Sequence, residues 1–132
     1  MASELPTIVV VEDDAGISQA IDRVLRAAGF TPVLFASAEA ALEAAAVEAA
    51  DGLVLDIHLP GMSGFELYQR LTLSGEALPA IFITARDEPA VRDEAERLGG
   101  AGSYLPKPFS GRDLLDAITR ALRGPGTASP EA

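Results

Sequence analysis

Five short apolar runs alternate with five segments in which apolar residues recur at helical spacing. The runs are rich in β-branched residues, which is typical of strands. The segments between them repeat an apolar residue at every third or fourth position, which predicts amphipathic helices. The predicted strands cover residues 7–11, 31–35, 53–56, 80–84 and 103–105. Apolar positions within residues 17–28, 38–49, 65–71, 91–98 and 114–122 mark the predicted helices.

The strand-like runs are apolar without alternation, so both faces of each strand are expected to be buried. Such strands form parallel sheets that carry helices on both sides. The regular alternation of strand and helix therefore predicts an α/β fold of the (βα)5 type. We expect a doubly wound, flavodoxin-like sheet of five parallel strands in the order 2-1-3-4-5.

Polar residues mark the predicted starts of the helices, and glycines mark two of their ends. Ser63 and Glu66 have the spacing of a capping box. Further N-caps are predicted at Asp14, Ser37 and Ser110, and at Asp87 ahead of Pro89. Gly29 and Gly99 are predicted to end helices.

The helix predicted over residues 91–98 has the thinnest apolar stripe, formed by Val91, Ala95 and Leu98 among charged neighbours. A helix that buries little apolar area is displaced at a small cost in free energy. We therefore expect motion and partner contacts at this helix rather than at the first one.

A chain of 132 residues with 48% hydrophobic residues and a mean hydropathy of +0.23 can form one domain with its own core. We expect this domain to cover residues 1–123, and residues 124–132 to form a disordered tail or a linker stub. The sequence has no cysteine and a single histidine, which leaves no disulfide and no Cys or His metal site. Any bound metal must be held by oxygen.

The formal net charge of −10 argues against a nucleic-acid partner, because phosphate backbones are bound by clustered Lys and Arg. The first residues lack the basic start and apolar stretch of a signal peptide. No segment approaches the roughly 18 apolar residues of a membrane span. We therefore expect a cytoplasmic protein without nucleic-acid or membrane partners.

Acidic residues stand at the ends of two predicted strands. Glu12 and Asp13 follow the first strand, and Asp56 ends the third. In the order 2-1-3-4-5 these strands are neighbours, so the three carboxylates are expected to share one crevice. Carboxylates that share a crevice repel one another unless they are protonated or bind a hard cation. Mg²⁺ is favoured because it accepts carboxylates together with phosphate oxygens, and Mn²⁺ is the alternative.

Two more polar side chains are expected at the same edge of the sheet. Thr84 ends the fourth strand and can donate a hydrogen bond to a phosphoryl oxygen, and Lys107 follows the fifth strand and can place an ammonium beside it. Asp14 is assigned to a helix cap rather than to the metal.

In this order and on these elements, the motifs resemble the response-regulator receiver domain of two-component signalling, in particular the stand-alone chemotaxis regulators. The likeness runs from about residue 7 to residue 122, which is nearly the whole chain. Asp56 falls on the phosphoacceptor of that family. The other segments that carry the likeness are Val10-Val11-Glu12-Asp13-Asp14, Leu59-Pro60-Gly61-Met62-Ser63-Gly64, Phe82-Ile83-Thr84-Ala85-Arg86 and Lys107-Pro108-Phe109.

The resemblance implies a signalling module that modifies only itself, not an enzyme with turnover. Asp56 would accept a phosphoryl group from the phosphohistidine of a sensor histidine kinase or of a histidine phosphotransfer protein. Mg²⁺ would be held by Asp13, Asp56 and the backbone carbonyl of His58, and Glu12 would act through bound water.

The resemblance also implies roles around the phosphoryl group. Thr84 and Lys107 would stabilise it, and Thr84 and Tyr104 would form a switch that changes the surface around the fourth helix, the fifth strand and the fifth helix. That surface would bind a downstream protein that the sequence does not identify. The side chains of His58 and Arg86 are expected to tune the rates.

The segment around Lys107 departs from the family pattern, because Pro106 stands directly before it. A proline lacks a backbone donor and is tolerated at sheet edges, which suits a border strand but puts its last pairing in doubt. The resemblance further predicts a cis peptide bond between Lys107 and Pro108.

Two alternatives come from other functional classes. A phosphatase of the haloacid-dehalogenase type would use the same aspartyl nucleophile, but it commonly has a second Asp two positions later, where this chain has His58. A flavin or nucleotide binder on the same fold would have a Gly-rich or Ser-rich phosphate loop after the first strand, and Glu12, Asp13 and Asp14 stand there instead. Without an output domain, the chain is expected to be a stand-alone regulator or relay carrier, or a trimmed part of a longer protein.

Overall fold

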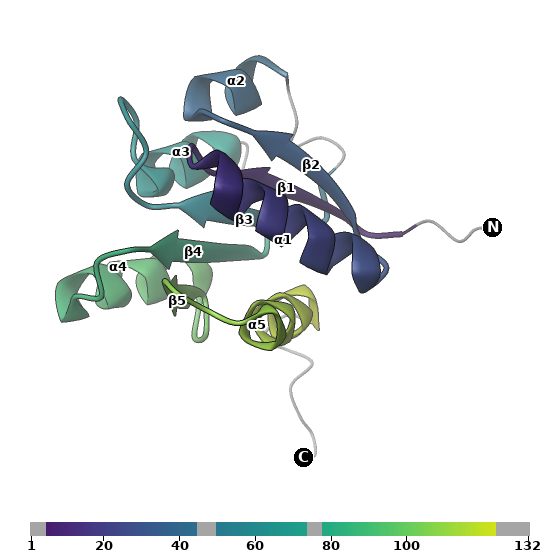
Figure 1. Cartoon of the computed structure of the whole chain (residues 1–132). Coiled ribbons are helices and arrows are strands. Elements are labelled where there is room, and N and C mark those ends of the chain that lie inside the picture. Colours follow the sequence, from purple (N-terminus) through teal and green to yellow (C-terminus); the bar gives the residue numbers. More distant parts are fainter. Residues whose placement is uncertain (1–4, 45–49, 74–77, 124–132) are drawn as a thin grey trace.

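The computed structural model describes residues 5–44, 50–73 and 78–123. Strands and helices alternate along the chain, as the sequence predicts (Figure 1). The strands are β1 (Thr7–Val11), β2 (Thr31–Phe35), β3 (Gly52–Asp56), β4 (Ala80–Thr84) and β5 (Tyr104–Pro106). The helices are α1 (Ala15–Ala27), α2 (Ala38–Glu43), α3 (Gly64–Leu71), α4 (Pro89–Gly99) and α5 (Gly111–Arg123).

The five strands pair in parallel in the order β2-β1-β3-β4-β5, which confirms the predicted flavodoxin-like topology. Alternate residues of the strands face two separate cores. On one face, Val9, Leu55 and Phe82 pack against α2, α3 and α4. On the other, Val10 and Ile83 pack against α1 and α5, the two helices at the front of Figure 1. The central strands are buried on both faces because both layers of helices cover them.

Four of the predicted N-caps are present as side-chain hydrogen bonds to the backbone. Asp14 accepts from Ile17 N, Ser37 from Ala40 N, Ser63 from Glu66 N and Ser110 from Asp113 N, at 3.0–3.1 Å. Each bond satisfies an amide of a first helical turn that has no partner within the helix. These caps fix where four helices begin after their strands.

One prediction about the ends of α4 was wrong. Its N-cap is Glu88, without a side-chain cap, because the Asp87 carboxylate is bound to the hydroxyl of Tyr104 instead. The helix ends at Gly99, as predicted, and the positive φ of 92° belongs to Gly100, which follows it. Gly99 serves close packing, since a Cβ there would lie 2.9 Å from the side chain of Ser103.

Several other predictions can be compared with the structure directly. Gly29 follows α1 with a φ of 95°, as predicted. The bond between Lys107 and Pro108 is cis, also as predicted. Pro106 does not disrupt the edge, because it pairs with Thr84, and the amide of Lys107 donates to the Thr84 carbonyl at 2.7 Å. Residues 45–49 of the predicted second helix and the predicted tail, 124–132, lie outside the described residues.

The start of α3 lies directly against the end of β3. The amide of Gly64 donates to Ile57 O at 3.0 Å, and a Cβ at Gly64 would lie 2.4 Å from the carbonyl oxygen of Asp56. A contact that short with backbone requires displacement of the chain. Gly64 therefore permits the close approach that fixes the loop after Asp56.

We predict that Gly64→Ala lowers the free energy of unfolding by roughly 1–3 kcal/mol, because the added methyl group overpacks a rigid backbone contact. Gly16→Ala is the matched control, since its Cβ would lie 3.3 Å from only a carboxylate oxygen of Asp14. Urea denaturation of both variants measures the difference. Equal stability of the two variants would contradict the proposed role of Gly64.

Candidate functional site

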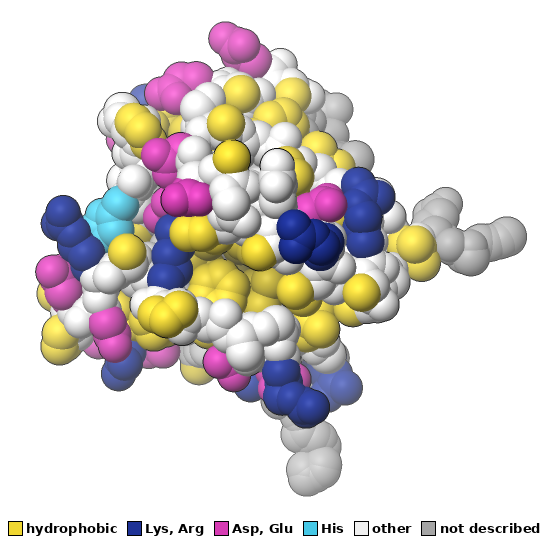
Figure 2. Space-filling view, viewed as in Figure 1, with side chains coloured by type: hydrophobic (Ala, Val, Ile, Leu, Met, Phe, Trp, Pro, Cys, Tyr) yellow, Lys and Arg dark blue, Asp and Glu magenta, His cyan; other side chains and the backbone are white. Residues whose placement is uncertain are grey.

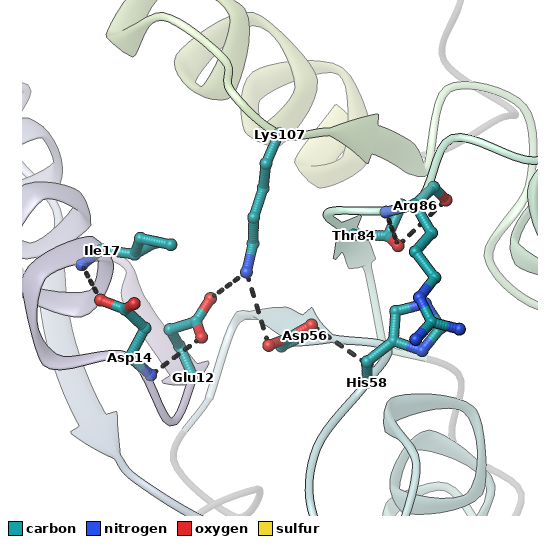
Figure 3. Close-up of polar contacts among 8 residues, drawn as sticks. All are labelled: Glu12, Asp14, Ile17, Asp56, His58, Thr84, Arg86 and Lys107. Carbon is teal, nitrogen blue, oxygen red and sulfur yellow. Dashed lines mark hydrogen bonds and ion pairs between the residues drawn. The ribbon is translucent and has the colours of Figure 1, made fainter.

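The polar residues singled out in the sequence meet at the carboxyl edge of the sheet (Figure 3). Asp56 and Thr84 are the last residues of β3 and β4, Glu12 directly follows β1, and Lys107 directly follows β5. The parallel register holds these ends level, since Val11 pairs with Leu55, next to Glu12 and Asp56 respectively. The topology thus brings together side chains that are far apart in the sequence.

Three carboxylates form an acidic cluster at this edge. Oxygens of Glu12, Asp13 and Asp56 all lie within 4.8 Å of one another. Glu12 and Asp56 are buried, with 2% and 4% of their surface exposed, whereas Asp13 is exposed. The cluster can hold a hard cation, because it offers only oxygen ligands and one side of it faces solvent.

Lys107 is the cation that the described residues bring to this cluster. Its Nζ lies 2.8 Å from Glu12 Oε1 and 3.5 Å from Asp56 Oδ2, and its side chain is 14% exposed. Beyond this ion pair, Glu12 Oε1 has no hydrogen-bond partner among the described residues. A buried carboxylate oxygen whose one partner among the described residues is the Lys107 ammonium is consistent with a cation site, where a metal or its water could serve as a further partner.

Burial and charge shift the pKa values of this pair. Burial raises the pKa of Glu12 to about 7, and the nearby Asp56 adds to the rise, although hydrogen bonds from Lys107 and from the amide of Asp14 oppose it. Burial alone would lower the pKa of Lys107, but the two carboxylates raise it above its ordinary value. Lys107 is therefore charged throughout the physiological range, while Glu12 can exchange a proton within it.

The loops around Asp56 hold its carboxylate and its neighbours in place. The amide of His58 donates to Asp56 Oδ1 at 3.1 Å, while the His58 side chain is exposed. The amide of Asp14 donates to Glu12 Oε2 at 3.0 Å, and the Asp14 carboxylate caps α1 as predicted. Asp56 Oδ1 and Oδ2 therefore face two different partners, a backbone amide and Lys107.

Thr84 lies at the predicted edge, but its hydroxyl is already engaged with the loop that follows β4. Thr84 Oγ1 accepts from Arg86 N at 2.9 Å and donates to Arg86 O at 3.1 Å (Figure 3). Tyr104, 9% exposed, directs its hydroxyl to the same loop, where it lies 2.9 Å from Asp87 Oδ1. Sequence reasoning missed this role of Asp87, because an acidic residue two positions before Pro89 has the pattern of a helix cap.

An apolar hollow of about 270 Å³ opens beside the site, between α1 and the start of α5. Figure 2 shows apolar side chains gathered there, next to charged groups. Ile17, Val24, Phe109 and Leu114 contribute to its lining, together with the stem of Lys107.

Comparison with known proteins identifies the family to which this fold belongs. Residues 8–119 match the model of the response regulator receiver domain. The chain belongs to the response regulator receiver domain family. A receiver domain is a phosphorylation-controlled signalling module rather than a turnover enzyme, which decides against the phosphatase and flavin alternatives. The buried Asp56 within the acidic cluster is consistent with the phosphoaspartate site of such a domain.

Curated relatives are identical to this receiver domain at more than a third of the matched positions. It is 38% identical over 116 residues to the response regulator MprA of Mycobacterium ulcerans, and 36% identical over 117 residues to the transcriptional regulatory protein CreB of Escherichia coli. These matches cover 88% and 89% of the chain but only 50% and 51% of the relatives. The receiver domain thus spans about half the length of the curated relatives that it matches.

Solved structures confirm the architecture. A CheY-like receiver domain protein from Methanospirillum hungatei has a TM-score of 0.80 and 27% identity, with 90% of this chain and 94% of that chain covered. The response regulator StyR has a TM-score of 0.80 and 40% identity, with 91% of this chain and 60% of that chain covered.

Within the described residues, no helix is long and apolar enough to span a membrane.

The raised pKa of Glu12 predicts how the stability of the metal-free protein depends on pH. Because the pKa rises from an ordinary 4.5 to about 7, the stabilisation from protonated Glu12 is fully present below about pH 4.5 and is lost as the pH rises through 7. Relative to wild type, Glu12→Gln should therefore gain roughly 1–3 kcal/mol across this window. Urea denaturation with a chelator present measures the difference, and a difference that is the same at both ends of the window would refute the assignment.

Proposed function

We propose that Asp56 accepts a phosphoryl group from a phosphohistidine and that this modification switches the surface formed by α4, β5 and α5. The observation that carries the proposal is the position of Asp56, a buried carboxylate at the end of β3 with Lys107 3.5 Å away and two further carboxylates beside it. In the transfer, an Asp56 carboxylate oxygen forms a bond to phosphorus, and the phosphorus–nitrogen bond of the donor breaks. The electron pair of that bond leaves with the donor imidazole.

The residues that would hold Mg²⁺ are Asp13, Asp56 and the backbone carbonyl of His58, with Glu12 acting through water. The acidic cluster fits a cation, because its oxygens lie within 4.8 Å of one another and one of the buried oxygens is paired only with Lys107. When bound, Mg²⁺, or Mn²⁺ in its place, neutralises charge on the phosphoryl oxygens and on the carboxylates.

Lys107 supplies a fixed positive charge to the phosphoryl group. Its ammonium already faces Asp56 and Glu12, so it needs little movement to pair with a phosphoryl oxygen instead. Electrostatic preorganisation of this kind is a major source of phosphoryl-transfer catalysis. Lys107 therefore balances the charge of the carboxylates before phosphorylation and stabilises the phosphoryl group after it.

Thr84 links the phosphoryl group to the rest of the switch. Its hydroxyl must leave Arg86 O before it can donate to a phosphoryl oxygen, because a hydroxyl has one hydrogen. Tyr104 responds through the same loop. The side chains of His58 and Arg86 are exposed, and they would tune the rates of phosphorylation and hydrolysis.

The donor partner would be a sensor histidine kinase or a histidine phosphotransfer protein. The apolar hollow between α1 and the start of α5 adjoins Lys107, so it offers a donor protein apolar contact beside the reacting carboxylate. The downstream partner would bind the surface around α4, β5 and α5. The net charge of −10 disfavours direct contact of this domain with nucleic acid.

Phosphorylation at Asp56 can be tested with acetyl phosphate as a small-molecule donor. We expect intact-mass spectrometry to show one added phosphoryl group on the wild type with Mg²⁺, and none on Asp56→Asn or on a sample with a chelator. Asp93→Asn, which changes an exposed carboxylate on α4, is the control and should be modified as wild type is. Modification of Asp56→Asn to the wild-type extent would exclude Asp56 as the acceptor.

Metal binding is tested separately through thermal stability. Mg²⁺ at about 100 times its dissociation constant should stabilise the wild type by about 2.7 kcal/mol, because it binds only the folded state. Asp13→Asn should lose most of this gain, whereas Asp14→Asn should keep it, since Asn caps a helix as well as Asp does. An equal gain in wild type and in Asp13→Asn, measured by thermal unfolding, would remove Asp13 from the metal site.

A further inference from the structure

Two hydroxyl groups compete for acceptors on the loop between β4 and α4. Thr84 Oγ1 donates to Arg86 O at 3.1 Å (Figure 3). The Tyr104 hydroxyl accepts from Glu88 N at 3.1 Å, and it lies 2.9 Å from Asp87 Oδ1 and 3.3 Å from Arg86 O. Because each hydroxyl carries one hydrogen, Tyr104 can donate fully to only one of its two acceptors. The shorter distance and the charge of the acceptor favour Asp87.

Arg92 supports this choice of acceptor. Its guanidinium lies 3.7 Å from the same oxygen, Asp87 Oδ1, and 5.4 Å from the centre of the Tyr104 ring. Arg92 therefore places a positive charge beside the Asp87 carboxylate and over the phenol ring. Burial and the hydrogen bond to Asp87 both raise the pKa of Tyr104, so the phenol retains the hydrogen that it donates.

We propose that Asp87 is a positioning residue that holds the Tyr104 hydroxyl in the unphosphorylated state and thereby opposes the switch. The inference rests on the proposed function, in which Thr84 turns to a phosphoryl group on Asp56. That turn removes the hydrogen from Arg86 O, and this partly buried carbonyl then lacks the donor that it had. The Tyr104 hydroxyl, 3.3 Å away, then transfers its hydrogen bond from Asp87 to Arg86 O.

This exchange connects Asp56 to the protein surface, because each hydroxyl has a single hydrogen to donate and must leave one acceptor to bind another. Thr84 passes from Arg86 to the phosphoryl group, and Tyr104 passes from Asp87 to Arg86. The Asp87 carboxylate, 57% exposed, is then left with Arg92 at the start of α4. A partner that contacts this end of α4 would therefore encounter a changed arrangement of the Asp87 carboxylate and the Tyr104 ring.

The chain offers a direct probe, because it has no tryptophan and only two tyrosines, Tyr68 and Tyr104. In a Tyr68→Phe background, all tyrosine fluorescence comes from Tyr104. A phenol that donates to a carboxylate is quenched, because its excited state loses a proton to the acceptor. The fluorescence of Tyr104 therefore reports whether its partner is Asp87 or a backbone carbonyl.

The experiment titrates this background protein with beryllium fluoride, a reversible mimic of a phosphoryl group, at fixed Mg²⁺. We expect fluorescence to rise on binding. In Asp87→Asn the fluorescence should be high before binding, and the affinity for beryllium fluoride should increase about tenfold, because a neutral amide oxygen accepts the bond that favours the unmodified state more weakly than a carboxylate does. Asp93→Asn, the control on α4, should match the background protein, and Asp87→Glu, which keeps the carboxylate, should restore quenching.

The outcomes separate the two proposals. If the background protein binds beryllium fluoride but Asp87→Asn leaves both affinity and fluorescence unchanged, Asp87 has no positioning role and the proposed function stands. If neither beryllium fluoride nor acetyl phosphate modifies the site in the presence of Mg²⁺, the proposed function fails and the inference fails with it. Asp87→Ser also removes the charge and serves as the second variant if Asp87→Asn does not fold.

Discussion

The mutual repulsion of three carboxylates at the end of β1 and β3 is the constraint on which the site depends. Glu12, Asp13 and Asp56 are within 4.8 Å of one another, and two of them are removed from water. The domain tolerates this arrangement because Lys107 stands opposite and because Glu12 can bind a proton near neutral pH. Both compensations are reversible, so a cation or a phosphoryl group can replace them. The repulsion between the carboxylates therefore makes the cluster respond to a cation or to a phosphoryl group.

The fold maintains this arrangement through its topology and not through contacts within the site. Because β1 lies between β2 and β3, the chain after β1 and the chain after β3 leave the sheet side by side. Caps at Asp14 and Ser63 then turn both chains into helices at once, and the close packing of Gly64 against the backbone of Asp56 leaves the second loop little freedom. The two cores on either side of the sheet keep the strand ends level, so the carboxylates cannot separate to relieve their repulsion.

The sequence predicts the sheet and its order, because apolar periodicity is a local pattern of the chain. It also predicts that polar residues at strand ends lie close together, because parallel strands end at the same edge of the sheet. These residues are Glu12, Asp13, Asp56, Thr84 and Lys107. The sequence does not predict which acceptor a hydroxyl chooses. Thr84 and Tyr104 were assigned to a switch by resemblance, but their engagement with Arg86 and Asp87 depends on loop geometry that no pattern of residue types contains. The wrong cap at Asp87 has the same origin, since a contact from β5 decides the position of its carboxylate.

The free energy that the switch requires limits how much of it any single hydrogen bond can supply. Moving a two-state equilibrium from 1:99 to 99:1 takes about 5.5 kcal/mol, whereas one hydrogen bond to a charged group contributes roughly 1.5–3 kcal/mol. The exchange at Tyr104 is therefore too small to drive the change alone, and it is large enough to set the starting point. In the proposed mechanism, the remainder comes from the phosphoryl contacts of Thr84 and Lys107. Movement of α4 itself costs little free energy. Ala95 is the one buried residue of α4 within the described structure, so movement of that helix disturbs little of the core.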